Sequence, residues 1–324
     1  MPSETANNPH ALIDPQQAEA LARNAEIVAD LGGPGETISE NRERAEAART
    51  VWNQGGPVMA VNEARTIPGP FRDVPVQFYK PDDEGDLPVF VYLHGGGFRI
   101  GGPRTNDLQM RQLADDWRGA VISADYLHVP EHTFPDPVDE IVAVLEWIAA
   151  NGAEWGLDGT RIAVGGASAG ASVALGSALT LRDKGRGDLL RAVASLYGVL
   201  DYNLESDSMN ELGGGDFMLT NAYTQMVYDG YVTDPADRAD PRAFAIHADP
   251  AGLPPILIEA AQLDPIRDDS LNFAKMLTEA GHPHELEVYA GVLHAYFGYS
   301  GVIDEARRSV ADLAVFLDKH LGGR

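Results

Sequence analysis

The ten residues Arg161–Gly170 read RIAVGGASAG, a short apolar run that leads directly into a turn and then into a helical pattern. RIAVG is typical of a buried strand, and the apolar residues that follow Ser168 are typical of a buried helix. Only glycine and alanine stand beside Ser168, because larger side chains would clash in so tight a turn. The turn also places the Ser168 hydroxyl at a helix N-terminus, where backbone N–H groups favour developing negative charge. The alternative is that these residues are merely a Gly/Ala-rich helix start, whose small side chains allow close packing against the sheet. This alternative stays open.

Strand and helix patterns alternate on both sides of this unit, which predicts an α/β protein with a mostly parallel central sheet and helices on both faces. The predicted strands are 74–79, 89–93, 120–124, 161–165, 192–196, 256–260 and 285–289. The predicted helices are 106–117, 138–150, 169–183, 268–280 and 304–320. Ligands of such sheets bind at the carboxyl ends of the strands.

Two segments depart from this alternation. The N-terminal part predicts two helices, 15–30 and 39–51, ahead of any strand, and the segment 201–250 is rich in Gly, Asp, Tyr and Met. Both could fold together as a helical cap over the upper edge of the sheet. The predicted division is therefore N-terminal cap helices 1–50, a first core part 51–200, a cap insertion 201–250 and a second core part 251–324.

The chain of 324 residues has 49 acidic and 24 basic side chains, which gives a formal net charge of −25. Such a surface repels phosphate backbones and anionic lipids, so we expect neither a nucleic-acid partner nor a membrane partner. An anionic substrate would need a locally basic pocket.

The absence of cysteine excludes disulfides, a thiol nucleophile and thiolate metal sites. The N-terminal sequence lacks the pattern of a secretory signal, and the expected location is cytoplasmic.

A second motif, His94-Gly95-Gly96-Gly97-Phe98, follows the apolar strand PVFVYL. Glycines let the backbone approach a substrate carbonyl and aim N–H groups at an oxyanion as it forms. The alternative is a loop that binds phosphate, but neither a Walker lysine nor a GxGxxG context accompanies it.

A serine nucleophile needs a base, and the base needs an acid that orients it. Asp264 follows the strand ILIEAA and His294 follows the strand ELEVYA, so both stand at carboxyl ends of late strands. The order Ser, then Asp or Glu, then His, each after a late strand, is the one that α/β-hydrolases use for acyl transfer. Asp268 and Asp269 are rival acids that resemble ordinary charges in the first turn of a helix. The rival bases, His282 and His284, lie before the last strand.

Five separated motifs resemble the hormone-sensitive-lipase-like bacterial carboxylesterases of the α/β-hydrolase superfamily, from about Pro88 to the C-terminus. They are HGGGF, Tyr126 with Pro130-Glu131-His132 and Phe134-Pro135, GASAG, Leu263-Asp264-Pro265 with Arg267-Asp268, and Leu293-His294. The resemblance implies the α/β-hydrolase fold with a helical cap. It implies Ser168 as nucleophile, His294 as general base and acid, Asp264 as the residue that orients His294, and an oxyanion hole of the backbone N–H groups of Gly96, Gly97 and Ala169.

Two positions differ from the family pattern. Ala167 stands where an acidic residue usually precedes the nucleophile. The segment that usually reads Tyr-Arg-Leu-Ala-Pro-Glu is Tyr-Leu-His-Val-Pro-Glu here (126–131), so Leu127 replaces the arginine and a histidine, His128, follows it. We expect His128 to pack rather than to catalyse, and Glu131 to fix the loop beneath the site. His94 is expected to support the glycine loop rather than to react.

These features predict a serine carboxylesterase that hydrolyses short- to medium-chain esters through an acyl-enzyme and needs no metal or organic cofactor. An amidase, lactonase or deacetylase with the same triad stays open, as does a small-molecule binding protein that has lost catalysis. The expected partner is a small-molecule ester. By resemblance, a homodimer could form at the sheet edge near Glu285–Tyr289.

Overall fold

A computed structural model describes residues 8–82 and 85–323, in which eight strands form one sheet in the order β1-β2-β4-β3-β5-β6-β7-β8. Residues 1–7, the start of the predicted N-terminal cap segment, lie outside the described residues. The strands β1–β2 and β2–β4 pair antiparallel, and the remaining neighbours pair parallel. The strands are β1 (Val61–Pro68), β2 (Asp73–Lys80), β3 (Leu87–Leu93), β4 (Ala120–Ala124), β5 (Leu157–Ala167), β6 (Leu190–Leu196), β7 (Ile256–Leu263) and β8 (His284–Leu293).

The sequence patterns did not predict β1, the edge strand beside β2. Its residues VNEARTIP include Glu63 and Arg65, and only Ile67 is buried. A strand that pairs on one side and faces solvent with most of its side chains carries little apolar alternation, so its sequence resembles a loop.

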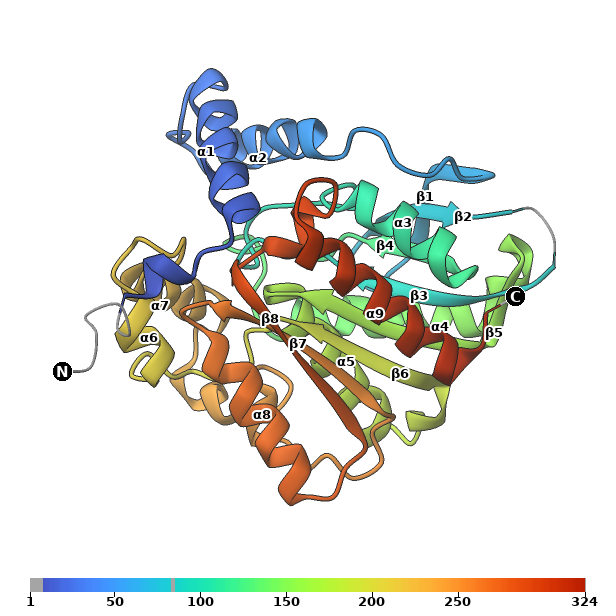
Figure 1. Cartoon of the computed structure of the whole chain (residues 1–324). Helices are drawn as coiled ribbons and strands as arrows, with labels where there is room; N and C mark the ends of the chain where they lie inside the picture. Colours follow the sequence, from blue (N-terminus) through green and yellow to red (C-terminus); the bar gives the residue numbers. More distant parts are fainter. Residues whose placement is uncertain (1–7, 83–84, 324) are drawn as a thin grey trace.

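Helices cover both faces of the sheet (Figure 1). α3 (Asp107–Trp117) and α9 (Asp304–Leu321) pack on one face, and α4 (Asp136–Asn151), α5 (Ala169–Asp183) and α8 (Arg267–Glu279) pack on the other. Within the described ranges, no helix is long and apolar enough to cross a membrane.

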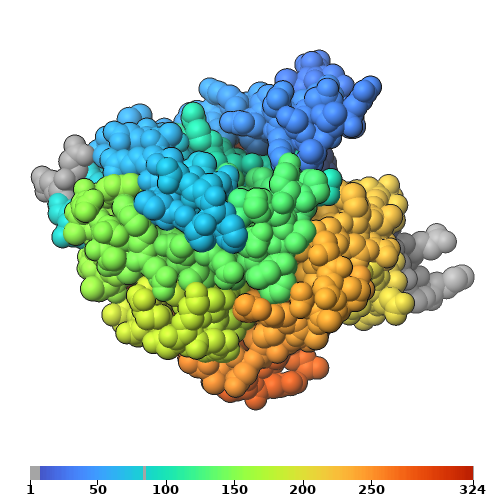
Figure 2. Space-filling model, turned by 180° about the vertical axis from the view of Figure 1, so that it is seen from behind, coloured from blue at the N-terminus to red at the C-terminus, as the bar shows by residue number. Residues whose placement is uncertain are grey.

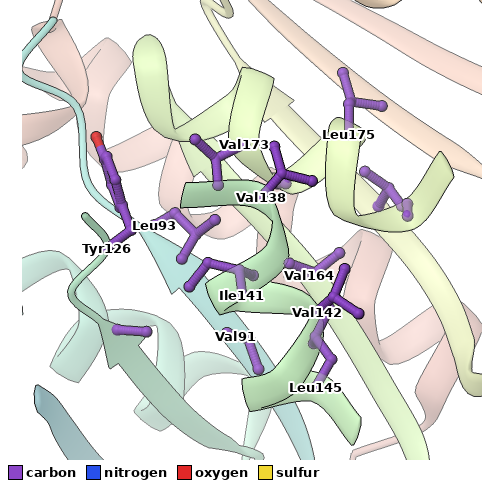
Figure 3. Packing of buried hydrophobic residues seen from close by; sticks show 14 of the residues in the cluster. Val91, Leu93, Tyr126, Val138, Ile141, Val142, Leu145, Val164, Val173 and Leu175 are labelled. Atoms are coloured by element: carbon purple, nitrogen blue, oxygen red, sulfur yellow. The ribbon is translucent and has the colours of Figure 1, made fainter. Parts of the chain in front are cut away.

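The sheet divides the core into two hydrophobic layers because side chains alternate along each strand. On β3, Val91 and Leu93 point to the layer under α4 and α5, whereas Phe90 and Tyr92 point to the layer under α3 and α9. Figure 3 shows the first layer, in which α4 side chains such as Ile141 face β3 and β5. β3 is buried along its whole length, which explains its continuous apolar sequence.

Four further helices gather at one end of the sheet: α1 (Pro15–Asp30), α2 (Ile38–Trp52), α6 (Asp207–Leu212) and α7 (Asn221–Tyr231). Figure 1 shows the N-terminal pair in blue and α6 and α7 in yellow, and Figure 2 shows both groups on the same side of the molecule from behind. Side-chain caps fix their starts: Thr37 and Glu40 form a capping box on α2, and Thr220 caps α7.

The strand β8 forms the other edge of the sheet. Leu286 and Val288 on this strand are 38% and 41% exposed. The homodimer at this edge stays a prediction.

Candidate active site

Ser168 stands between β5 and α5 with φ 54° and ψ −121°, a conformation that non-glycine residues rarely adopt. A side chain at Gly170 would lie 2.2 Å from the carbonyl oxygen of Leu93, so only glycine allows the turn to pack this closely against the end of β3. The Ser168 N–H donates to Leu196 O at 2.8 Å and ties the turn to β6. Neighbouring strands therefore hold the strained residue in place.

The structure brings Ser168, His294 and Asp264 together in one hydrogen-bonded chain. The distance from His294 Nε2 to Ser168 Oγ is 2.8 Å, and the distance from His294 Nδ1 to Asp264 Oδ2 is 2.7 Å. Asp264 Oδ1 accepts from the Ile266 N–H at 3.0 Å, which fixes the carboxylate plane. Because a carboxylate only accepts, the Nδ1 atom carries the ring proton and the Nε2 lone pair accepts the serine hydroxyl. This tautomer is the one that can remove the proton from Ser168.

All three side chains stand just beyond carboxyl ends of parallel strands, namely β5, β7 and β8. They are nearly inaccessible: Ser168 is 7% exposed, His294 6% and Asp264 fully buried. Low accessibility removes competing water and strengthens the charge interactions in the chain. The Tyr197 ring packs edge-on against the His294 ring, with 5.1 Å between centroids, and further restricts the imidazole.

The glycine loop after β3 lies beside Ser168. The backbone N–H groups of Gly96, Gly97 and Ala169 donate to no protein acceptor among residues 8–82 and 85–323. Ala169 is the first residue of α5, so its N–H also belongs to the positive end of the helix. Three unpaired donors near a serine can bind an oxyanion.

A cavity of about 360 Å³ opens above Ser168. The glycine loop forms one wall, α1 and α2 contribute Asn24, Val28, Ala45, Ala48 and Arg49, and α7 contributes Tyr223, Thr224, Val227 and Tyr228. Its lining is mostly apolar, and its size fits a small organic molecule. The two segments that depart from the strand and helix alternation thus both supply walls of the cavity.

Among the described residues, neither of the rival acids Asp268 and Asp269 forms a hydrogen bond with His294. Asp268 accepts from the Ser208 N–H at 2.8 Å. Asp269 is 1% exposed and accepts from the Leu200 and Asp201 N–H groups, at 3.0 and 3.2 Å. Asp269 is therefore not the ordinary helix-terminal charge that its position predicts: burial raises its pKa well above the usual range, and it ties α8 to the segment after β6.

The rival bases lie at the start of β8, the end opposite to His294 on the same strand. His282 Nε2 contacts Pro254 O at 3.1 Å, and His284 Nδ1 contacts His282 O at 2.9 Å. His282 lies just before β8 and His284 is its first residue, so neither reaches the serine at the other end of the strand.

A cluster that the sequence analysis did not predict lies behind the glycine loop. One ligand atom each from His94, Asp125 and His128 lies within 4.8 Å of the others. Two imidazoles and a carboxylate can bind a transition-metal ion, but Arg72 donates to Asp125 at 3.1 Å and its charge opposes a cation there. Burial lowers the pKa of His128 to about 3, so His128 is neutral and packs, as expected. The His94 ring stacks on Tyr126 at 4.6 Å.

Glu131 makes a bidentate ion pair with Arg42 of α2, at 2.9 and 2.7 Å. Its hydrogen bonds with Arg42 lower the Glu131 pKa to about 2. The same arginine donates to Arg99 O and Val129 O, so it fastens α2 to two core loops.

Comparisons with known proteins agree with this geometry. A family model described as alpha/beta hydrolase fold matches residues 90–298. An esterase from the archaeon Pyrobaculum calidifontis is 30% identical with a TM-score of 0.84, over 88% of this chain and 94% of that one. An ester hydrolase from the Lake Arreo metagenome is 30% identical with a TM-score of 0.87, over 96% and 100%. A thermostable carboxylesterase from a metagenomic library is 28% identical with a TM-score of 0.84, over 88% and 98%.

The matched region contains the glycine loop, the Ser168 turn, Asp264 and His294. The predicted fold class and family are therefore confirmed. The chain belongs to the α/β-hydrolase fold family, in its hormone-sensitive-lipase-like branch.

Proposed function

We propose that this carboxylic ester hydrolase cleaves short- to medium-chain esters through an acyl-enzyme on Ser168. The observation that carries the proposal is the continuous hydrogen-bonded chain from Ser168 through His294 to Asp264, beside three unpaired backbone N–H groups. The cavity of about 360 Å³ above the serine supports a small substrate.

In the proposed reaction, Ser168 Oγ forms a bond to the ester carbonyl carbon while its proton passes to His294 Nε2. The carbonyl electron pair becomes an oxyanion, which accepts hydrogen bonds from Gly96, Gly97 and Ala169. The carbon–oxygen bond to the alcohol then breaks, and His294 returns the proton to the leaving oxygen. Water repeats these steps on the acyl-enzyme and releases the acid. The Asp264 carboxylate orients His294 and stabilises the imidazolium that forms twice in the cycle.

We also propose that residues 1–50 and 201–250 act as the cap of this site. Their helices α1, α2 and α7 line the cavity, and the ion pair of Arg42 with Glu131 fastens the first segment to the core. The cap then sets the depth of the acyl pocket, whereas the core supplies the chemistry.

The test is hydrolysis of 4-nitrophenyl esters of increasing acyl length by the purified protein, beside Ser168→Ala. We expect activity that peaks at short or medium chains and falls at least about 10³-fold in the variant. The matched control is Ser172→Ala, which removes a buried hydroxyl on α5 that donates to Val199 O and lies outside the proposed chain.

A second measurement addresses the intermediate. Rapid acid quench during turnover of a slow ester should leave one acyl group on the peptide that contains Ser168, detected as a mass increase. Turnover without any acylated peptide, or undiminished turnover by Ser168→Ala, would remove the acyl-enzyme from the proposal.

A further inference from the structure

Arg49 on α2 is the only arginine, lysine, aspartate or glutamate among the described residues that line the cavity above Ser168. This is unexpected in a chain with 49 acidic and 24 basic side chains, where a cation normally finds a carboxylate. No ion pair joins Arg49 to any acidic side chain within the ranges 8–82 and 85–323. Its counterion is therefore absent from the described part of the protein.

The guanidinium is nevertheless held in a fixed position. Its Nε donates to Thr105 O at 3.0 Å, its Nη2 donates to Gly298 O at 2.5 Å, and it lies 5.3 Å from the centre of the Tyr299 ring. A side chain at Gly298 would lie 2.4 Å from Nη2, so the glycine leaves the space that the guanidinium fills. Gly298 and the proposed base His294 line the same cavity as Arg49.

Two hydrogen bonds leave most of the donor capacity of Arg49 unused. A guanidinium has five N–H groups, and Nη1 donates to no acceptor among the residues that the structure describes. One N–H of Nη2 is unused as well. The unused N–H groups of Nη1 and Nη2 can donate two parallel hydrogen bonds, one to each oxygen of a carboxylate.

The side chain of Arg49 is partly buried, and partial burial of a cation without an anion costs solvation free energy. This burial lowers the pKa of Arg49, although an arginine remains charged at every pH at which the protein folds. A bound anion would recover part of the lost solvation by pairing with the charge. A carboxylate suits the site better than a phosphate, because a second negative charge would find no further cation in the cavity lining.

We propose that the cavity binds esters that carry a carboxylate, with Arg49 as the residue that binds this carboxylate while Ser168 attacks the ester group. This inference rests on the proposed function, because it assigns the substrate class of the same site. It also supplies the locally basic pocket that an acidic protein needs for an anionic substrate. Arg49 acts by binding and takes no part in the transfer of the proton.

The test compares kcat/KM for matched ester pairs that differ in one carboxylate. One pair is the 4-nitrophenyl monoester of glutarate against 4-nitrophenyl valerate, which places the charge on the acyl side. The other is 4-carboxyphenyl butyrate against 4-carbamoylphenyl butyrate, which places it on the alcohol side. We expect the charged member to be preferred in at least one pair, and its preference to fall about tenfold or more in Arg49→Gln.

The ratio within a pair is insensitive to partial unfolding, because both esters meet the same amount of folded enzyme. Arg49→Lys keeps the charge and should retain part of the preference. The control Arg44→Gln removes another arginine of α2 that donates to backbone carbonyls, of Gly32 and Gly33, and does not line the cavity. It should leave the ratio unchanged.

The outcomes separate this inference from the proposed function. Hydrolysis of no ester of either pair would overturn the proposed function. Hydrolysis of the neutral esters with no preference for a charged one, or with a preference that survives Arg49→Gln, would overturn the assignment of Arg49 and leave the esterase in place.

Discussion

Replacing Asp264 by asparagine should almost abolish turnover while leaving the fold intact, because it changes which ring nitrogen of His294 carries the proton. Asp264 Oδ1 accepts the Ile266 N–H at 3.0 Å, and Oδ2 faces His294 Nδ1 at 2.7 Å. Asparagine has one oxygen, and the buried Ile266 N–H requires it. The amide NH₂ group then faces Nδ1, and because it only donates, the ring proton moves to Nε2. Nε2 lies 2.8 Å from Ser168 Oγ, and once protonated it can no longer accept the serine proton.

We expect kcat to fall by about 10⁴, which corresponds to about 5 kcal/mol of lost transition-state stabilisation. The assay is kcat with saturating 4-nitrophenyl butyrate, beside thermal unfolding of the same preparations. Asp268→Asn is the matched control, because Asp268 stands four residues later and bonds to the Ser208 N–H instead of His294. A folded Asp264→Asn protein that keeps more than a tenth of kcat, or an equal loss in the control, would refute the reasoning.

Two further changes test the packing and the buried charge of the core. Gly170→Ala would place a methyl group 2.2 Å from Leu93 O. We therefore expect the variant to lose about 1–3 kcal/mol of unfolding free energy and to turn over substrate more slowly. The control Gly102→Ala, which has open space around it, should change neither quantity. Chemical denaturation measures this difference, and equal stability of the two variants would contradict it. Burial raises the pKa of Glu259 to about 8, so between about pH 4.5 and 8 the folded state keeps a proton that the unfolded state has lost, and stability falls as pH rises through this window. The Tm of Glu259→Gln relative to the parent should therefore rise from pH 4.5 to 8, and a difference independent of pH would show that Glu259 is not the group that titrates.

Much of the site follows from local sequence because its parts are local structures. The turn at Ser168 needs small neighbours, and Asp264 and His294 each follow a strand directly, so chain order and short-range pattern locate all three. The edge strand β1 lacked such a pattern, since most of its residues, Glu63 among them, are exposed. Asp269 is a second residue whose environment the sequence did not predict. Its position resembles an exposed helix start, but the packing of α8 against the segment after β6 buries it.

The sequence by itself determined the alternation of strands and helices from β2 onward outside the segment 201–250, the glycine loop and the three residues of the proposed triad, because each depends on residues close together in the chain. Only the tertiary structure decided what surrounds the serine. Arg49 and Gly298 are 249 positions apart and meet in one hydrogen bond, and Arg42 meets Glu131 across 89 positions. No periodicity in the sequence reveals such pairs, because these residues meet only where the N-terminal helices pack against loops of the folded core. For this reason, the charge and shape of the cavity had to be read from the folded molecule.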